Sequence, residues 1–118
     1  MSYKIAICDD EKIYLEEISQ NIKKRNSDYK IYVYNSGAEL VKNNPDYDMI
    51  FLDIEMPDMD GMTTAERLRE MKFDGIIIFL TSHTEFMPDA FKVKAFRFLS
   101  KPIDAKKLDE ALCTAEKE

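Results

Sequence analysis

The chain has 118 residues, which is the size of one domain and enough for a hydrophobic core of its own. It carries 23 acidic and 17 basic residues, and the net charge of -6 argues against nucleic acid or anionic lipid as a partner of this domain. No apolar run approaches the ~20 residues that span a bilayer and no export signal is present, so we expect a cytoplasmic protein with no membrane partner. Cys8 and Cys113 lie in apolar stretches, which predicts reduced, buried thiols.

Short apolar runs alternate with longer segments of helical period, which predicts an α/β fold with a parallel sheet. Five runs are predicted to be strands: 4–8, 30–34, 49–52, 76–80 and 95–99. The third and fourth are apolar at every position, as expected for strands that helices cover on both faces, so we place them in the middle of the sheet. The second and fifth carry charge and are expected nearer its edges.

Five helices are expected between and after these strands. Apolar stripes at helical spacing mark the first, third and last of them: Leu15, Ile18 and Ile22; Met62, Ala65, Leu68 and Met71; and Leu108, Ala111, Leu112 and Ala115. Capping residues precede the second, third and last helices: Ser36, Asp60 and Asp104. The fourth helix, between 84 and 93, contains Pro88, so we expect it to begin late, near Met87, after an irregular segment 82–86.

Four of the predicted strands end in side chains that carry chemistry. Asp9 and Asp10 follow the first strand, Asp53 the third, Thr81 the fourth and Lys101 the fifth. In an open parallel sheet the carboxyl ends of the strands form the edge where ligands bind. Each of these residues alone is more often a cap or a turn residue, so the functional prediction depends on their joint placement.

Three carboxylates gathered in one small pocket are expected to need a cation, and hard oxygen ligands suit Mg²⁺. A metal ion beside a carboxylate suits phosphoryl transfer, in which the carboxylate becomes an aspartyl phosphate. With Gly37, Gly61 and Gly75 as its only glycines, the chain has no glycine-rich loop for dinucleotides or nucleoside triphosphates. The first loop, Asp9-Asp10, has the wrong charge to hold the phosphate of a flavin.

Together these motifs resemble the receiver domain of bacterial two-component response regulators. The resemblance covers the whole chain through segments 8–11, 48–53, 56–61, 81–82 and 98–102. It implies a doubly wound, flavodoxin-like sheet of five parallel strands in the order 2-1-3-4-5, with five helices. It also implies that residues 1–118 are one receiver domain and that the output domain is absent from this chain.

The resemblance implies a role for each residue of the acidic pocket. Asp53 matches the phosphoacceptor of the family. Asp10 and Asp53 are expected to bind Mg²⁺ directly, Asp9 through water, and the backbone carbonyl of Glu55 is expected to complete the protein ligands. Lys101 is expected to pair with Asp53 before phosphorylation and with a phosphate oxygen afterwards, across a cis bond to Pro102.

The resemblance further implies a conformational switch. In the family, the hydroxyl that matches Thr81 moves toward the phosphate and the aromatic ring that matches Phe98 swings inward behind it. This movement resets the face formed by the fourth helix, the fifth strand and the fifth helix. Glu55 and His83 match the positions that flank the attacking water, so they are expected to tune the lifetime of the phosphate. His83 would otherwise be an ordinary loop residue.

The resemblance also names the expected partners. The phosphoryl donor is expected to be a sensor histidine kinase, and phosphorylation is expected to favour a dimer. Segments 53–61, 81–83 and 90–93 resemble receivers joined to LytTR-type DNA-binding domains, which predicts control of transcription through a C-terminal output domain. Residues 115–118 are predicted to be helical with no stop signal, so we expect a piece of a longer regulator rather than a stand-alone receiver.

Two alternatives stay open at this stage. A Mg²⁺-dependent phosphatase of the haloacid dehalogenase type also forms an aspartyl phosphate on an α/β sheet, but its Asp-x-Asp motif belongs near the first strand, whereas Asp53 lies in mid-chain. A degenerate receiver that acts only by docking should have an incomplete acidic pocket, whereas this sequence supplies every member. A receiver modifies only itself, so we do not expect an enzyme with turnover.

Overall fold

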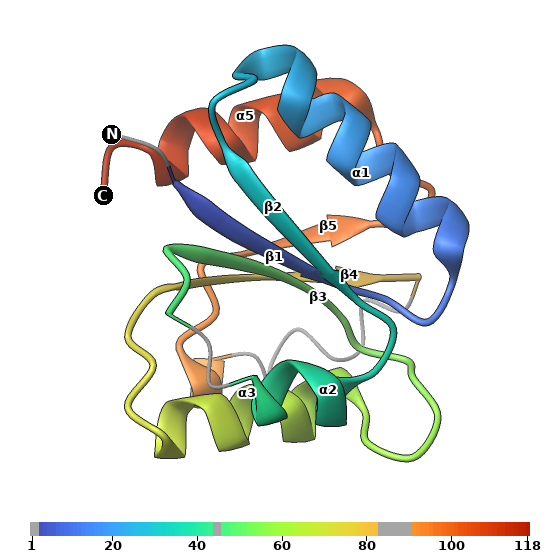
Figure 1. The fold of residues 1–118 in the computed structure, drawn as a ribbon, viewed down its shortest axis with the longest axis vertical. Helices are drawn as coiled ribbons and strands as arrows, with labels where there is room; N and C mark the ends of the chain where they lie inside the picture. The colour runs from blue at the N-terminus through green and yellow to red at the C-terminus, as the bar shows by residue number, and fades with distance from the viewer. Residues whose placement is uncertain (1–2, 44–45, 83–90) are drawn as a thin grey trace.

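The computed structural model describes residues 3–43, 46–82 and 91–118. One five-stranded parallel sheet runs through the domain in the order β2-β1-β3-β4-β5, as predicted (Figure 1). The strands are β1 (Lys4–Cys8), β2 (Lys30–Tyr34), β3 (Met49–Asp53), β4 (Ile76–Thr81) and β5 (Arg97–Ser100). The central strand, β3, is buried at every residue, while β2 and β5 form the edges, so the apolar and charged runs predicted the strand positions correctly.

Helices cover both faces of the sheet. In Figure 1, α1 (Lys12–Arg25) and α5 (Ala105–Ala115) lie on one face, and α2 (Gly37–Lys42) and α3 (Gly61–Glu70) lie on the other. The predicted fourth helix, with its late start, lies mostly outside the described residues, and its described end, Phe91–Val93, forms a 3₁₀ turn, η2. No helix in the described part of the chain is both long enough and apolar enough to cross a membrane.

The three predicted helix caps are confirmed. The side chains of Ser36, Asp60 and Asp104 each accept a hydrogen bond from a backbone N–H in the first turn of the following helix. Each cap satisfies one of the N–H groups that a helix start leaves without an intrahelical partner. The helices therefore begin where the sequence predicted.

Two hydrophobic cores lie on opposite faces of the sheet. On one face, α1 and α5 pack against the odd-numbered residues of β1 and β3 and the even-numbered residues of β4. The helices contribute Ile18 and Ile22 of α1 and Leu108 and Leu112 of α5. On the other face, the helices α2 and α3 cover the alternate strand residues, which include Ala6, Cys8, Ile50 and Leu52. Side chains of a strand alternate between its faces, so each strand contributes to both cores.

Two predictions about single side chains are wrong. Cys8 is buried as expected, but Cys113 is exposed because it follows the buried Leu112 on the helix and so lies outside the apolar stripe of α5. The sequence places Met71 in the apolar stripe of α3, but it is the C-cap residue and 42% of its surface is exposed. In both places the apolar residue lies beside the buried stripe or beyond its end.

Two predicted boundaries also change. The last strand begins at Arg97 rather than at residue 95, because Lys94 has a φ of 55° and the chain is still turning toward the sheet there. The last helix ends at Ala115 and does not continue to residue 118, because the N–H groups of Lys117 and Glu118 bond to carbonyls three residues back. The side chain of Glu116 is bound by Arg25 at this end.

Candidate metal centre

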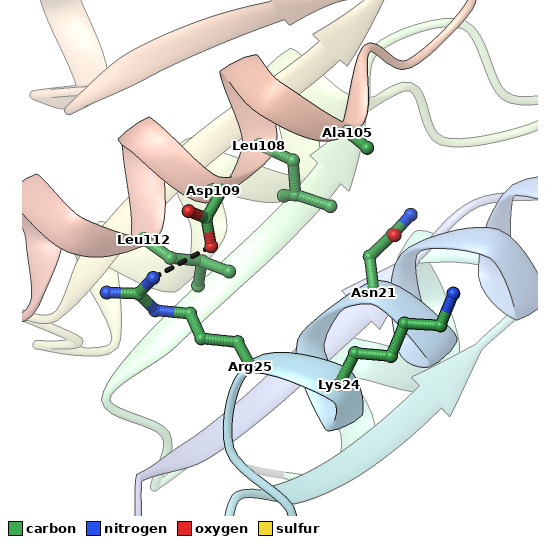
Figure 2. Close-up of a pocket in the computed structure, with 7 residues that line it drawn as sticks. All are labelled: Asn21, Lys24, Arg25, Ala105, Leu108, Asp109 and Leu112. Carbon is green, nitrogen blue, oxygen red and sulfur yellow. Dashed lines mark hydrogen bonds and ion pairs between the residues drawn. The ribbon is translucent and has the colours of Figure 1, made fainter.

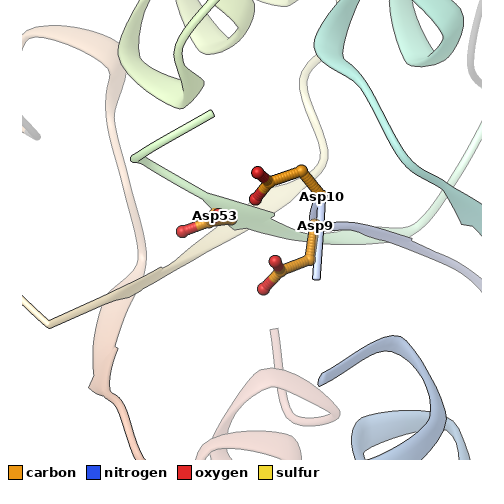
Figure 3. A group of neighbouring side chains, drawn as sticks. All are labelled: Asp9, Asp10 and Asp53. Carbon is orange, nitrogen blue, oxygen red and sulfur yellow. The ribbon is translucent and has the colours of Figure 1, made fainter. Parts of the chain in front are cut away.

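The register of the central strands brings two aspartates together. In the β1–β3 pair Cys8 lies opposite Leu52, so the residues that follow, Asp9 and Asp53, lie side by side at the carboxyl edge. One carboxylate oxygen from each of Asp9, Asp10 and Asp53 lies within 4.8 Å of the others. Figure 3 shows the three carboxylates projecting to the same side of the strand ends. Asp9 and Asp53 are buried and Asp10 is exposed, so the cluster opens to solvent on one side.

Backbone groups hold the two buried carboxylates. The N–H of Glu11 donates to Oδ1 of Asp9 at 2.9 Å, and the N–H of Glu55 donates to Oδ1 of Asp53 at 3.3 Å. Gly61, at the start of α3, packs so closely that a Cβ there would lie 2.1 Å from the carbonyl oxygen of Asp53. Only glycine allows this approach without displacing the backbone of β3.

Lys101 joins the acidic cluster from the end of β5. Its Nζ lies 2.9 Å from Oδ2 of Asp9 and 3.2 Å from Oδ1 of Asp53, and its side chain is only 6% exposed. The backbone N–H of Lys101 bonds to the carbonyl of Thr81, which ties this residue to the end of β4. The bond between Lys101 and Pro102 is cis, as the family resemblance implied.

Two neighbours of Lys101 were not identified from the sequence. The carboxylate of Glu11 lies 3.8 Å from the ammonium, and the ring centroid of Tyr14 lies 4.2 Å from it. Glu11 follows the aspartate pair directly as the N-cap residue of α1, and Tyr14 is the third residue of that helix. Their position in the sequence gives a weak signal, because which side chains of a first helical turn face back to the sheet depends on how the helix leaves the strand.

The two predicted switch residues lie on neighbouring strands, Thr81 at the end of β4 and Phe98 on β5. Thr81, the last residue of β4, is 1% exposed and its hydroxyl donates a hydrogen bond to the carboxylate of Glu55. Phe98 on β5 is half-buried, and its ring packs against Phe79 with a centroid separation of 5.7 Å. His83 lies outside the described residues.

The electrostatics of the cluster are those of buried like charges beside one cation. Burial, and then the charge of Asp9, raise the pKa of Asp53 to about 7, although Lys101 opposes this change. Burial lowers the pKa of Lys101, but its ion pairs with Asp9 and Asp53 outweigh burial and raise the pKa overall. Burial, and then the charge of Asp9, raise the pKa of Cys8 to about 12, so this thiol is not a nucleophile.

The donor set fits a hard divalent cation. All three clustered side chains offer carboxylate oxygens, and Oδ2 of Asp53 is buried with no hydrogen-bond donor among the described residues. Buried charged oxygens without a donor are costly unless a cation satisfies them. Mg²⁺ prefers such oxygens and keeps several of its waters, which the exposed side at Asp10 would allow.

A separate pocket of about 280 Å³ lies between α1 and α5 (Figure 2). Its lining includes Asn21 and Lys24 of α1 and Leu108 of α5, and an ion pair between Arg25 and Asp109 crosses it. None of its lining residues belongs to the acidic cluster or to the predicted switch. This pocket is therefore separate from the candidate metal centre, which lies at the carboxyl edge of the sheet.

A doubly wound parallel sheet with three carboxylates and a lysine at its carboxyl edge is the arrangement expected of a receiver domain. The family model described as "Response regulator receiver domain" matches residues 5–113, and the chain belongs to this family. This match decides against the phosphatase alternative. The LytTR-type resemblance drawn from the sequence is also confirmed, since the proteins similar to this chain include the sensory transduction proteins LytT and LytR.

The relatives extend beyond the region shared with this chain. The sensory transduction protein LytT of Bacillus subtilis is 27% identical over 113 residues, which cover 92% of this chain and 46% of LytT. The transcriptional regulatory protein YpdB of Escherichia coli K12 is 30% identical over 101 residues, which cover 84% of this chain and 41% of YpdB. The chain thus spans less than half the length of these two proteins.

A solved structure carries the same fold. It is the CheX-CheY-BeF3-Mg+2 complex from Borrelia burgdorferi, with a TM-score of 0.85 and 25% identity, and it covers 95% of this chain and 87% of that chain. It therefore supports the receiver fold independently of the sequence match.

Proposed function

We propose that this domain is a phosphorylation-operated switch in which Asp53 accepts a phosphoryl group from a sensor histidine kinase. One observation supports this proposal above the others. Asp53 is buried beside Asp9 and Lys101, with one carboxylate oxygen held by the N–H of Glu55 and the other without a hydrogen-bond donor among the described residues. A carboxylate held in this way is oriented for attack on phosphorus.

The proposed reaction is an in-line phosphoryl transfer. An oxygen of Asp53 forms a bond to phosphorus as the bond from phosphorus to the donor nitrogen or oxygen breaks, and the leaving group departs with the bonding electron pair. The ammonium of Lys101 pairs with the carboxylate of Asp53 before the transfer and with a phosphoryl oxygen after it. The ammonium therefore stabilises negative charge that moves away from the protein backbone as the new bond forms.

Mg²⁺ is the cofactor that the donor set fits. Asp10 and Asp53 would bind it directly, Asp9 through water, and the carbonyl of Glu55 would complete the protein ligands. When bound, the ion neutralises negative charge on the phosphoryl group. The proposal is supported by the three clustered carboxylates and by the presence of BeF3 and Mg in the name of the similar Borrelia burgdorferi complex.

Thr81 and Phe98 would convert the new charge into a change of surface. The hydroxyl of Thr81 would leave Glu55 and bind a phosphoryl oxygen, which frees space behind it for the ring of Phe98. The half-buried position of Phe98 beside Phe79 supports this role. The face formed by the fourth helix, β5 and α5 would then change its shape and its affinity for partners.

Glu55 and His83 would set how long the phosphate survives. The carboxylate of Glu55 already lies within hydrogen-bonding distance of Thr81, which supports a position next to the phosphoryl group. Alanine at either position is expected to change the rate of dephosphorylation. An unchanged rate in both variants would contradict this assignment.

The partners follow from the family and from the length of the relatives. We propose that the natural protein acts in the cytoplasm, that its kinase is a sensor histidine kinase and that a C-terminal output domain regulates transcription. Phosphorylation would favour a dimer through the face that it changes. The domain catalyses only its own phosphorylation and dephosphorylation.

The proposal is tested with a small phosphodonor. Acetyl phosphate with Mg²⁺ should add one phosphoryl group to the unmodified protein, detected by intact mass, and none to Asp53→Asn. Asp58→Asn, which changes an exposed acid in the next loop, is the matched control and should be labelled normally. Equal labelling of all three proteins would contradict the role of Asp53, and continuous release of phosphate from esters would contradict a domain that modifies only itself.

A further inference from the structure

The ammonium of Lys101 is shared by four side chains. Asp9, Asp53 and Glu11 supply carboxylate oxygens at 2.9, 3.2 and 3.8 Å, and the ring centroid of Tyr14 lies 4.2 Å away. A cation at this distance from a ring centroid is attracted by the negative face of the aromatic ring. Tyr14 is therefore a direct neighbour of the group that is expected to contact the phosphoryl oxygen.

The three carboxylates attract the ammonium in different directions. Asp9 and Asp53 are buried, whereas the side chain of Glu11 is 58% exposed. An ammonium is strongly hydrated, so an exposed carboxylate nearby offers Lys101 a position in contact with water. Nevertheless its side chain is only 6% exposed. The ion pairs with Asp9 and Asp53 hold the ammonium inward, and a group that disfavours the outward position would add to their effect.

Tyr14 has the properties of that group. It is half-buried in the first turn of α1 and packs against the hydrophobic core between α1, α5 and the sheet, which fixes the position of its ring. The ring covers the ammonium without accepting a hydrogen bond, so it takes the place of water beside a cation that is already paired on its other sides. A flat apolar ring does this better than an aliphatic side chain, because only the ring has a negative face.

We propose that Tyr14 is a positioning residue for phosphoryl transfer, whose ring holds the Lys101 ammonium beside Asp53 and prevents its movement out to Glu11. This inference rests on the proposed function of Asp53. The proposed role of Tyr14 requires the face of its aromatic ring and not its phenol hydroxyl. Phenylalanine should therefore replace tyrosine, whereas leucine or methionine of similar bulk should not.

The first experiment measures the rate of phosphorylation by acetyl phosphate at saturating Mg²⁺. Tyr14→Phe should react within about twofold of the unmodified protein, and Tyr14→Leu should react about tenfold more slowly. Tyr14→Met repeats the test with a more adaptable side chain. Tyr32→Leu, which removes an exposed tyrosine from β2, is the matched control and should react normally.

The second experiment tests the competition with Glu11. If Tyr14 prevents an outward movement of Lys101, then Glu11→Gln should restore most of the lost rate in the Tyr14→Leu background. A purely structural defect in Tyr14→Leu would not be repaired by this change. Failure of Glu11→Gln to restore the rate would therefore overturn the proposed competition.

The third experiment detects the contact itself in the unphosphorylated protein by nuclear magnetic resonance. The ε-methylene protons of Lys101 should show an upfield ring-current shift in the unmodified protein and in Tyr14→Phe, and lose it in Tyr14→Leu. An unchanged shift and an unchanged rate in Tyr14→Leu would overturn the role of Tyr14 alone. Absence of any labelling in the unmodified protein would instead contradict the function of Asp53, and the role of Tyr14 with it.

Discussion

Arg25, the last residue of α1, binds Glu116, the C-cap residue of α5, through two hydrogen bonds of 2.6 and 3.1 Å. The hydroxyl of Tyr29 donates to the same carboxylate, and Arg25 also reaches Asp109 at 2.7 Å (Figure 2). The two helices that cover one face of the sheet are therefore joined at their ends. A bidentate pair of this kind is stronger than an ordinary surface ion pair, since its geometry fixes both partners.

We expect Glu116→Gln to lower the free energy of unfolding by about 1 kcal/mol, because the amide keeps the shape but loses the charge that Arg25 and Tyr29 bind. Urea denaturation at pH 7 measures the change. Glu110→Gln is the matched control, since this glutamate is exposed on the same helix. Equal losses in the two variants would mean that the charge of α5, and not this contact, determines the stability.

The same carboxylate makes stability depend on pH. The hydrogen bonds from Arg25, opposed in part by burial and helped by Tyr29, hold the pKa of Glu116 below its ordinary value. A lowered pKa in the folded state stabilises the protein above the unfolded pKa, and this contribution is lost as the pH falls through the folded value. The stability difference between the unmodified protein and Glu116→Gln should therefore be full at pH 6 and above and shrink below about pH 4. A difference that stays constant down to pH 3 would contradict the pKa change.

Arg69 of α3 is expected to hold the segment that enters β5. Its guanidinium donates four hydrogen bonds of 2.8 to 3.1 Å to backbone carbonyls, those of Phe73, Gly75, Val93 and Lys94. Arg69→Met keeps the aliphatic stem but leaves these carbonyls without their donor, so we expect a loss of about 2–3 kcal/mol in the free energy of unfolding. The change is measured by urea denaturation.

Arg67→Met is the control for this prediction, because Arg67 is exposed on the same helix, and it should change stability by less than about 0.5 kcal/mol. Arg69→Lys should recover only part of the loss, since an ammonium cannot reach carbonyls on both sides as the planar guanidinium does. Full recovery with lysine would show that only the charge at this position matters.

The acidic cluster is expected to lower the stability of the domain when no divalent cation is bound. Burial and the charge of Asp9 disfavour ionised Asp53, so at pH 8 with a chelator Asp53→Asn should raise the free energy of unfolding by about 1–2 kcal/mol. Mg²⁺ should stabilise the unmodified protein in a concentration-dependent way and the variant much less. Thermal unfolding across a Mg²⁺ titration tests both statements, with Asp58→Asn as the control. A variant that melts at a lower temperature than the unmodified protein under chelation would contradict the unfavourable charge.

The strands of the sheet could be predicted because each is marked by an apolar run of neighbouring residues in the sequence. The apolar runs at β3 and β4 indicate burial on both faces, and the residue after each run is then placed at the carboxyl edge. Asp9, Asp53 and Lys101 come together for this reason alone. The strand order, in contrast, came from the resemblance to a family, because periodicity does not specify which strands are neighbours.

The neighbours of Lys101 could not be predicted in the same way. Whether Tyr14 covers the ammonium depends on the angle at which α1 leaves the sheet and on the rotamer of one ring, and neither has a signature in the spacing of residues. For a related reason the sequence predicts a buried Cys113, whereas the thiol is exposed. An apolar residue next to a buried stripe has the composition of the core but points in another direction.

The pairing of Cys8 with Leu52 has a consequence for how this domain can change during evolution. A strand that gains or loses one residue turns every later side chain to its opposite face, so a single insertion within β1 or β3 would separate Asp9 from Asp53 even if both residues remained. Loops elsewhere can lengthen freely, but the lengths of these two strands are constrained by chemistry as well as by packing. Deletion and insertion tolerance should therefore be lowest in the two strands that carry the aspartates.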